Sequence, residues 1–285
     1  MSDVRDIAEW WAEHPMTYAN FHGEVEYKDE HVDIGSPAFF EHVDQTFYRW
    51  NQPLHDHRPF GKLFPYDEYR GKSVLELGCG MGTMGMNWAR QGANYSAVDL
   101  TPTAVQQTRR RFELYGLSGD IRQADARQLP FPDASFDYVY SWGVLMCSPE
   151  LDRSIAELMR VLKPGGGFGV MLYYRHSFLY GYMIRFVEGF LHNENRYLDA
   201  LGLASRYTDG AQQEGNPHMW PITKAEAREI FSPYSRDLDF KIYGTDLDGI
   251  MPYVMPGVGR ILPAWFVKPW ARRFGWSLWI HGHKA

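Results

Sequence analysis

A run of closely spaced glycines directly after a short apolar segment is the strongest chemical signature of the sequence. Gly78, Gly80 and Gly82 follow the β-branched and apolar run 73–77, and a helix-like pattern comes next. Glycines at such a turn let the backbone approach a ligand closely, and the start of a helix favours anionic groups. Asp99 ends the next apolar run, at the spacing of about 20 residues where an acid usually binds ribose hydroxyls. The combination predicts a nucleotide-type cofactor site rather than a tight turn with a surface acid.

Group transfer to a hydroxyl would also need a base, and three histidines are the leading candidates. His176 follows the last strand expected in the middle of the chain, whereas His22 and His218 lie in segments that could close over a pocket. A histidine near aromatic residues is more often structural, so each of the three is a candidate rather than an assignment. His281 and His283 share one face of an expected strand, where a solvated edge is favoured over a metal site, and we expect no bound metal.

Strand-like and helix-like patterns alternate through the middle of the chain. We expect strands over 73–77, 95–100, 120–124, 136–141 and 167–173, and helices over 83–91, 102–115 and 150–162. We expect further helices over 3–13, 37–50 and 223–231, with Thr223 as an N-cap, and further strands over 238–245 and 276–283. Strands alternating with helices over about 100 residues predict a parallel sheet with helices on both faces.

The glycine segment resembles motif I of the class I S-adenosylmethionine-dependent methyltransferases, which has the form acid-x-Gly-x-Gly-x-Gly. Glu76 stands two residues before Gly78, and Thr83 stands where a dinucleotide fingerprint would need Gly or Ala. Three further blocks are similar to that family, over residues 124–131, 136–139 and 158–167. The resemblance covers 73–174 and is closest to the small-molecule branch that includes ubiquinone and menaquinone C-methyltransferases.

The resemblance implies a fold, a cofactor and its contacts. The fold is α/β, with a Rossmann-like, doubly wound, mostly parallel seven-stranded sheet and helical, aromatic-rich cap segments. The cofactor is S-adenosylmethionine. Its implied contacts are Glu76, Gly78, Cys79, Gly80, Asp99, Leu100, Asp125, Ala126, Ser141 and Trp142. By the same resemblance, Glu76 would bind the methionine ammonium, Asp99 the ribose diol and Asp125 the adenine amino group.

One departure from this branch concerns the loop after the fourth expected strand. Many relatives have a pair of histidines there, where this chain has Leu145, Met146, Cys147 and Ser148. A base at that place is therefore in doubt. Cys147 does not follow a proline, as the nucleophile of cytosine-C5 methyltransferases does, and no Asn-Pro-Pro-Tyr-like motif follows the strand. We therefore do not expect a nucleic-acid substrate, and we interpret Cys147 as a small buried residue.

Composition sets further bounds on function. The chain has 285 residues with 29 Lys+Arg and 35 Asp+Glu, and its net charge of −6 excludes a broadly basic nucleic-acid binder. Its two cysteines are too few to staple a domain of this size and fit a reducing compartment. No run is long and apolar enough for a membrane helix, and the first residues carry acids, so we expect a cytoplasmic protein.

Aromatic residues make up 16% of the chain and gather on both sides of the expected core. We expect three parts: a helical lid over 1–72, the cofactor-binding core over 73–174, and a substrate cap with the last two strands over 175–285. An aromatic lid fits an apolar or planar acceptor, although the rings could equally pack the caps onto the sheet.

The C-terminal segment 249–285 combines these aromatic residues with five basic and no acidic residues. This composition is typical of a segment on an anionic membrane surface, but a role in capping the domain or in contacting a second copy of the chain is favoured.

These observations predict a class I methyltransferase that moves a methyl group to a small, apolar or aromatic acceptor, with O-, N- and C-methylation left open. A nicotinamide-dependent oxidoreductase is the first alternative, against which Glu76 and Thr83 argue. A catalytically silent, cofactor-binding regulator is the second, because cofactor binding does not require turnover.

Overall fold

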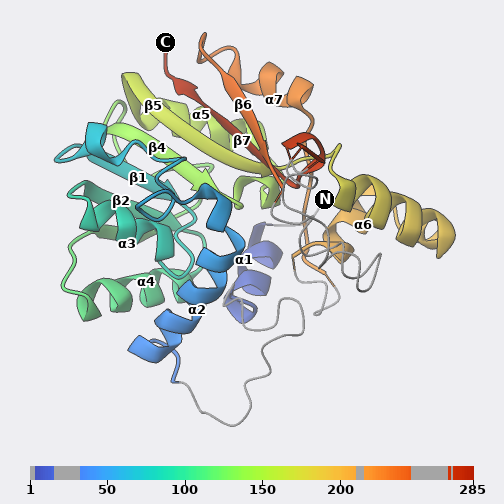
Figure 1. Ribbon diagram of the computed structural model, residues 1–285, viewed down its shortest axis with the longest axis horizontal. Coiled ribbons are helices and arrows are strands. Elements are labelled where there is room, and N and C mark those ends of the chain that lie inside the picture. Colours follow the sequence, from blue (N-terminus) through green and yellow to red (C-terminus); the bar gives the residue numbers. More distant parts are fainter. Residues whose placement is uncertain (1–3, 16–32, 210–214, 245–268, 271) are drawn as a thin grey trace. The chain divides into compact units, whose positions relative to one another are not determined.

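The computed structural model describes residues 4–15, 33–209, 215–244, 269–270 and 272–285 of the chain (Figure 1). Three sequence-based expectations therefore lie wholly or largely outside the described residues. They are the candidate base His22, the aromatic residues Tyr18, Phe21 and Tyr27, and most of the basic aromatic segment 249–285. In the described part, no helix is long and apolar enough to cross a membrane.

The described residues form a seven-stranded sheet with the order β3-β2-β1-β4-β5-β7-β6. The strands are β1 (Ser73–Leu77), β2 (Asn94–Asp99), β3 (Asp120–Gln123), β4 (Phe136–Trp142), β5 (Leu162–Tyr173), β6 (Asp239–Tyr243) and β7 (Ser277–His283). β2 pairs in parallel with β1 and with β3, whereas β6 and β7 are antiparallel. This arrangement confirms the mostly parallel, Rossmann-like α/β fold expected from the sequence.

Helices follow most of the strands. They are α1 (Val4–Glu13), α2 (Pro37–Trp50), α3 (Thr83–Arg90), α4 (Pro102–Leu114), α5 (Leu151–Val161), the π-helix η4 (Leu179–Leu191), α6 (Ala200–Tyr207) and α7 (Lys224–Phe231). Short 3-10 turns are η1 (Gln52–Leu54), η2 (Tyr66–Tyr69), η3 (Leu145–Cys147) and η5 (Glu194–Arg196). The helices α2, α4, α6 and α7 begin at side chains that cap them. The predicted N-cap Thr223 forms a capping box with Glu226, which fixes the start of α7.

The chain forms two compact units. The glycine-loop unit comprises residues 11–140 and 156–167, and the aromatic unit comprises residues 1–10, 141–155 and 168–285. The division of the sequence into lid, core and cap at residues 72 and 174 stays a prediction.

In the glycine-loop unit, the residues just before the first strand pack as part of the core. Tyr66 lies with its ring centroid 4.7 Å from that of Trp88, and Tyr69 lies 4.8 Å from Tyr138. All four side chains are buried. The aromatic residues of this segment therefore stabilise the unit by burying apolar surface beside the sheet.

In the aromatic unit, paired rings line the last strands. Tyr173 at the end of β5 stacks on Trp276 with centroids 4.2 Å apart, and Trp142 at the end of β4 lies 5.7 Å from Trp279. Along β7, His281 pairs with Asp239 at 3.1 Å, as His283 of the same strand does with Asp237 at 2.7 Å.

The main differences from the sequence-based expectation are two helices and one strand boundary. Neither η4 nor α6 was expected from the sequence. In η4, the exposed aromatic residues and the glycines Gly181 and Gly189 obscure the helical period of apolar residues. β5 begins at Leu162 instead of Gly167, so the strand includes the Lys-Pro-Gly-Gly segment that was expected to be a turn.

Candidate functional site

The glycine loop joins β1 to α3 at the edge of the sheet where β2 also ends. Leu77 pairs with Val98 in the β1/β2 register, which places the loop and Asp99 side by side. The Gly78 N–H donates to the Val98 carbonyl at 2.8 Å. Gly80 has a φ of +50°, a region that L-residues rarely adopt, and a Cβ placed on it would meet nothing within 4 Å. Open space therefore lies next to the backbone of the loop.

Asp99 links the end of β2 to this loop through its carboxylate. One carboxylate oxygen accepts from the Gly80 N–H at 3.1 Å. The other accepts from the Thr101 backbone N–H at 2.9 Å and from the Thr101 hydroxyl at 3.0 Å. Burial raises the pKa of Asp99, and these donors oppose that rise. Asp99 therefore lies beside the glycine loop, and its expected role in binding a ribose diol stays a prediction.

Glu76 lies on β1, two residues before the loop, and its side chain is 3% exposed. It accepts a hydrogen bond from the Tyr95 hydroxyl. The buried Tyr140 hydroxyl also favours the charged form of Glu76, although the two groups do not form an ordinary hydrogen bond. Burial outweighs both hydroxyls and raises the pKa of Glu76 to about 8. A cation beside this carboxyl would favour its charged form.

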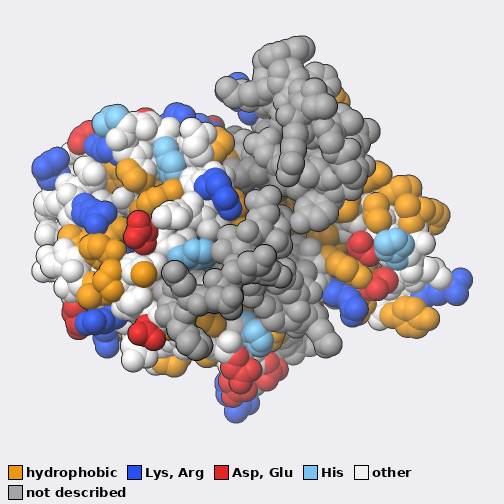
Figure 2. Space-filling view, turned by 60° about the horizontal axis from the view of Figure 1, so that its bottom comes forward, with side chains coloured by type: hydrophobic (Ala, Val, Ile, Leu, Met, Phe, Trp, Pro, Cys, Tyr) orange, Lys and Arg blue, Asp and Glu red, His pale blue; other side chains and the backbone are white. Residues whose placement is uncertain are grey.

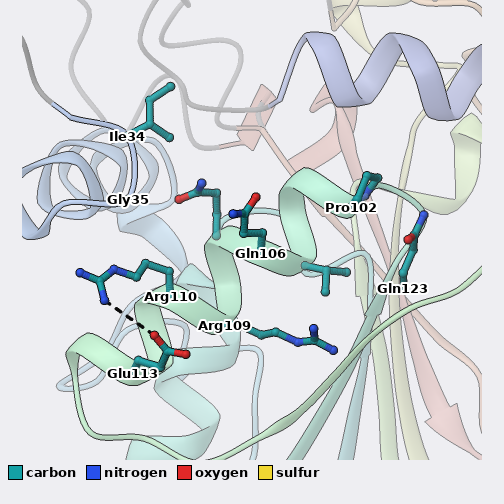
Figure 3. Close-up of a pocket in the computed structure, with 10 residues that line it drawn as sticks. Ile34, Gly35, Pro102, Gln106, Arg109, Arg110, Glu113 and Gln123 are labelled. Carbon is teal, nitrogen blue, oxygen red and sulfur yellow. Dashed lines mark ion pairs between the residues drawn. The ribbon is translucent and has the colours of Figure 1, made fainter.

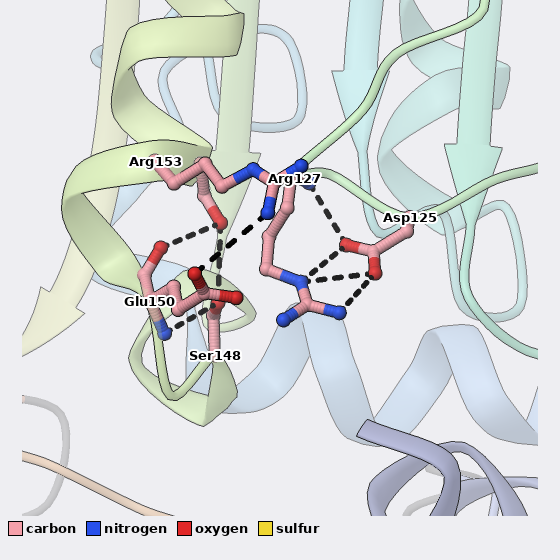
Figure 4. Close-up of polar contacts among 6 residues, drawn as sticks. Asp125, Arg127, Ser148, Glu150 and Arg153 are labelled. Carbon is pink, nitrogen blue, oxygen red and sulfur yellow. Dashed lines mark hydrogen bonds and ion pairs between the residues drawn. The ribbon is translucent and has the colours of Figure 1, made fainter. Parts of the chain in front are cut away.

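The remaining predicted adenine contacts follow β2 and β3 in the same unit. Both carboxylate oxygens of Asp125 accept from the Arg127 guanidinium, at 2.8 to 3.2 Å, as Figure 4 shows. Leu100 and Ala126 are half-buried, and the Leu100 carbonyl accepts from the Gln123 side chain at 3.1 Å. An adenine amino group would therefore share Asp125 with Arg127. Cys79 in the loop is buried, and burial raises the pKa of its thiol.

A buried ionic network behind the loop was not found from the sequence. Arg111 on α4 is 0% exposed and donates at 2.8 Å to the Met81 carbonyl and at 2.8 Å to the Thr83 hydroxyl. Its guanidinium also pairs with Asp44 of α2 and lies 5.0 Å from the centroid of the Phe40 ring. Arg111 lies on the face of α4 whose other residues are also buried. Its spacing from those residues could have indicated a buried position, but the sequence analysis did not consider it.

An open pocket of about 620 Å³ lies beside α4 in the same unit (Figure 3). It is lined by Ile34, Gly35, Pro102, Val105, Gln106, Gln107, Arg109, Arg110, Glu113 and Gln123. None of the predicted cofactor contacts lines it. Its connection to them is indirect, because Gln123, which borders the pocket, donates to the Leu100 carbonyl.

In the aromatic unit, Ser141 and Trp142 occupy the end of β4, where Ser141 is fully buried. Their predicted roles beside the methionine part of the cofactor stay predictions. After them, Cys147 ends the 3-10 turn η3 and is buried. Burial and the nearby Asp209 raise the pKa of the Cys147 thiol, which opposes formation of a nucleophilic thiolate.

The two described histidine candidates differ in their surroundings. His176 is exposed, and its ring packs edge-on against Tyr174 with centroids 5.6 Å apart. His218 is half-buried, and its Nδ1 is buried without a hydrogen-bond partner among the described residues. Burial lowers the pKa of His218, which favours its neutral ring. Both histidines stay candidates.

Asp209 is a further candidate that the sequence analysis did not identify. It is 7% exposed, and the Tyr173 hydroxyl donates to its carboxylate at 2.5 Å. Burial raises the pKa of Asp209 to about 6, against the lowering effect of Tyr173. The Asn216 side chain connects this group to the His218 segment, because it donates to the Asp209 carbonyl at 2.7 Å and accepts from the His218 N–H at 3.1 Å. Asp209 belongs to no local sequence motif, and it lies beside Tyr173 only in the folded chain.

Comparison with known proteins adds a family to this geometry. Residues 74–166 match the family model described as "Methyltransferase domain". This range contains all of β1 except Ser73, and it contains the glycine loop, Asp99 and Asp125. The match supports S-adenosylmethionine as the cofactor and the class I methyltransferase expected from the sequence.

Two curated relatives are similar to parts of the chain. One is the phthiotriol/phenolphthiotriol dimycocerosates methyltransferase 1 of Mycobacterium ulcerans (strain Agy99), 36% identical over 127 residues, which are 44% of this chain and 46% of the relative. The other is the phthiotriol/phenolphthiotriol dimycocerosates methyltransferase of Mycobacterium tuberculosis (strain ATCC 25618 / H37Rv), 40% identical over 100 residues, which are 34% and 36%. The match spans less than half the length of either relative.

Solved structures share the fold over more of the chain. A methyltransferase of Methanosarcina mazei described as SAM-dependent has a TM-score of 0.54 at 18% identity, over 78% of this chain and 98% of that chain. The [4+2]-cyclase SpnF has a TM-score of 0.52 at 18% identity, over 89% and 84%. At these identities the likeness shows the fold alone, and the cyclase indicates that this fold also serves other chemistry.

Proposed function

We propose that the chain transfers a methyl group from S-adenosylmethionine to a small, apolar or aromatic acceptor. The observation that carries this proposal is the Asp99 carboxylate, which ends β2 and accepts a hydrogen bond from Gly80 in the open glycine loop. The methyltransferase domain match over the same residues supports it. The oxidoreductase alternative is not favoured, because the match is to a methyltransferase family and Thr83 replaces the third residue of a dinucleotide fingerprint.

The residues of the glycine-loop unit fit this cofactor in three ways. Gly80 leaves open space where the adenosine and methionine parts would approach the backbone. Glu76 offers a buried carboxyl that an ammonium group would stabilise in its charged form. Asp99 keeps hydrogen-bonding capacity for a ribose diol beyond its contacts with Gly80 and Thr101. The bound cofactor supplies a methyl group already activated on a sulfonium.

The chain itself must align the acceptor, exclude water and receive any proton that the acceptor loses. His218 and the Tyr173–Asp209 pair are the groups of the aromatic unit best suited to the last task. Above about pH 6 the Asp209 carboxyl is charged and can take a proton through the Tyr173 hydroxyl, which already donates to it. A neutral His218 could do the same directly. His176 and His22 stay candidates with less support.

A hydroxyl acceptor has the most support. The two curated relatives are named for phthiotriol and phenolphthiotriol esters, and a triol carries hydroxyl groups. Attack by a hydroxyl oxygen needs a proton acceptor, and His218 and Asp209 are candidates for that role. C-methylation of a quinone-like ring, which resemblance to the ubiquinone and menaquinone branch implies, is the alternative.

A methyl-transfer assay with trideuteromethyl-labelled cofactor tests the proposal. We would offer the full chain a long-chain triol, a demethylated hydroquinone and an aliphatic amine, and detect the product by its mass increase. We expect label on the triol oxygen, with at least about a hundredfold loss of rate in Asp209→Asn or in His218→Ala, equivalent to about 2.7 kcal/mol.

Cofactor binding is the control for these variants, because neither residue belongs to the glycine-loop unit. Unchanged affinity together with a lost rate would assign the residue to proton transfer. Small losses in every variant of Asp209 and of the histidines would favour N- or C-methylation. Cofactor binding without transfer to any acceptor class would favour a silent regulator.

A further inference from the structure

A row of stacked aromatic rings runs along η4 in the aromatic unit. Phe178, Tyr182, Phe186 and Phe190 follow one another at intervals of four residues. Successive ring centroids lie 4.9, 5.7 and 5.8 Å apart, and each pair is stacked. Phe186 is 44% exposed and Phe190 is 66% exposed. Two phenylalanines this exposed on one helix form an apolar surface that the described fold does not cover.

The other side of the same helix is what holds it on the protein. Tyr180 and Ile184 of η4 are buried, and η4 packs against α6. Gly189 fits so closely that a Cβ there would lie 2.9 Å from the Asn195 side chain and 3.1 Å from that of Leu203. The helix is therefore anchored by the face opposite the most exposed rings.

The charges around the aromatic row are unevenly paired. Glu188 pairs with His192 at 2.8 Å, and Glu194 pairs with Arg206 at 3.7 Å. Arg185 on η4 and Arg196 on η5 are exposed and form no ion pair within the described residues. The acids of this surface are thus engaged, while two arginines remain available to an anionic partner. Figure 2 shows exposed hydrophobic side chains beside basic, acidic and His side chains at the right of the view, where this segment lies.

We infer that η4 docks onto an anionic lipid surface. The rings of Phe186 and Phe190 would enter the boundary between headgroups and acyl chains, with Tyr182 at the level of the headgroups. Arg185 and Arg196 would contact lipid phosphates. Exposed aromatic residues beside unpaired cations on an anchored helix have the composition of an interfacial membrane helix, whose binding combines apolar burial with electrostatic attraction. The inference does not depend on methyl transfer.

Sedimentation of the full chain with lipid vesicles tests this docking surface. The probes are vesicles of phosphatidylcholine alone and vesicles that also contain phosphatidylglycerol. We expect binding to the anionic vesicles, at least about tenfold weaker binding to the neutral ones, and further weakening with added salt. The double variant Phe186→Ser/Phe190→Ser should lose at least about tenfold in vesicle affinity.

Two control variants and a measurement of the molecular mass in solution distinguish docking through η4 from the alternatives. Tyr115→Ser removes an exposed aromatic side chain at the C-cap of α4, and it should leave vesicle binding unchanged. Trp270→Ser removes a 53%-exposed aromatic residue of the C-terminal segment. Loss of binding in that variant but not in the η4 variant would overturn the inference in favour of segment 249–285. So would the absence of vesicle binding by the unmodified chain, or a dimer that the η4 variant converts to a monomer.

Discussion

Glu76 is the residue whose ionisation should couple cofactor binding to pH. Burial raises its pKa to about 8, so the free carboxyl is mostly protonated at pH 7. An ammonium group beside it favours the charged form, and binding must then release the proton. Cofactor affinity should therefore rise with pH up to about 8 and fall by up to about tenfold per pH unit below it.

Calorimetry with S-adenosylhomocysteine in buffers of different ionisation enthalpy measures this release. We expect close to one proton released per molecule bound at pH 7, and none in Glu76→Gln, whose affinity should be weaker but insensitive to pH between about 6 and 8. Equal pH dependence in both proteins would contradict the assignment of Glu76 to the ammonium.

Asp99 should contribute to cofactor affinity through two charge-assisted hydrogen bonds to the ribose diol. Each is worth about 1.5–3 kcal/mol, so Asp99→Ala should weaken the binding of S-adenosylhomocysteine by at least about tenfold while the chain stays folded. Asp120→Ala is a matched control, because Asp120 begins β3 and pairs only with Arg122 among the described residues. An unchanged dissociation constant in Asp99→Ala would remove this residue from the site.

Cys147 should be dispensable for catalysis. Its thiol is buried, and both burial and Asp209 raise its pKa, so little thiolate forms near neutral pH. We expect Cys147→Ala to keep a methyl-transfer rate within about tenfold of that of the unmodified chain, measured with saturating cofactor. A collapse of the rate with the fold intact would assign a chemical role to the loop after β4.

At the scale of elements, α2 should support the glycine loop through the buried pair of Asp44 and Arg111. Removing the Asp44 carboxylate leaves the guanidinium of Arg111 buried without its charge partner, which costs about 3–5 kcal/mol of unfolding free energy. Asp44→Ala should show this loss in chemical denaturation, together with weaker binding of S-adenosylhomocysteine, because Arg111 also holds the Met81 carbonyl.

The control for this prediction lies on the same helix. Glu41 is exposed on α2 and forms no ion pair within the described residues, so Glu41→Ala should change the unfolding free energy by less than about 0.5 kcal/mol. An Asp44→Ala protein as stable as the Glu41→Ala protein would show that the pair does not stabilise the loop.

The strands and helices around the glycine loop were predictable because their apolar periods are strong and their ends carry caps or glycines. The expected helix over 102–115 and the observed α4 differ by one residue at the end. By contrast, η4 buries one side and exposes aromatic residues on the other, which blurs the period. Arg111 and Asp209 were missed because a charged residue is assigned to the surface unless the fold supplies its buried partner.

At the scale of the whole molecule, the shared fold does not by itself decide the chemistry. A methyltransferase and a [4+2]-cyclase resemble the chain with similar TM-scores. The match over residues 74–166 and the geometry of Glu76, Gly80 and Asp99 point to one cofactor rather than to one reaction. Cofactor selectivity is therefore the property on which the account depends most directly.

Titration calorimetry of the unmodified chain with S-adenosylmethionine, S-adenosylhomocysteine and NAD tests this central claim. We predict binding of the first two at one site per chain, weakened at least about tenfold by Asp99→Ala, and no measurable binding of NAD. Binding of NAD at a site that Asp99→Ala weakens, without binding of S-adenosylhomocysteine, would contradict the account.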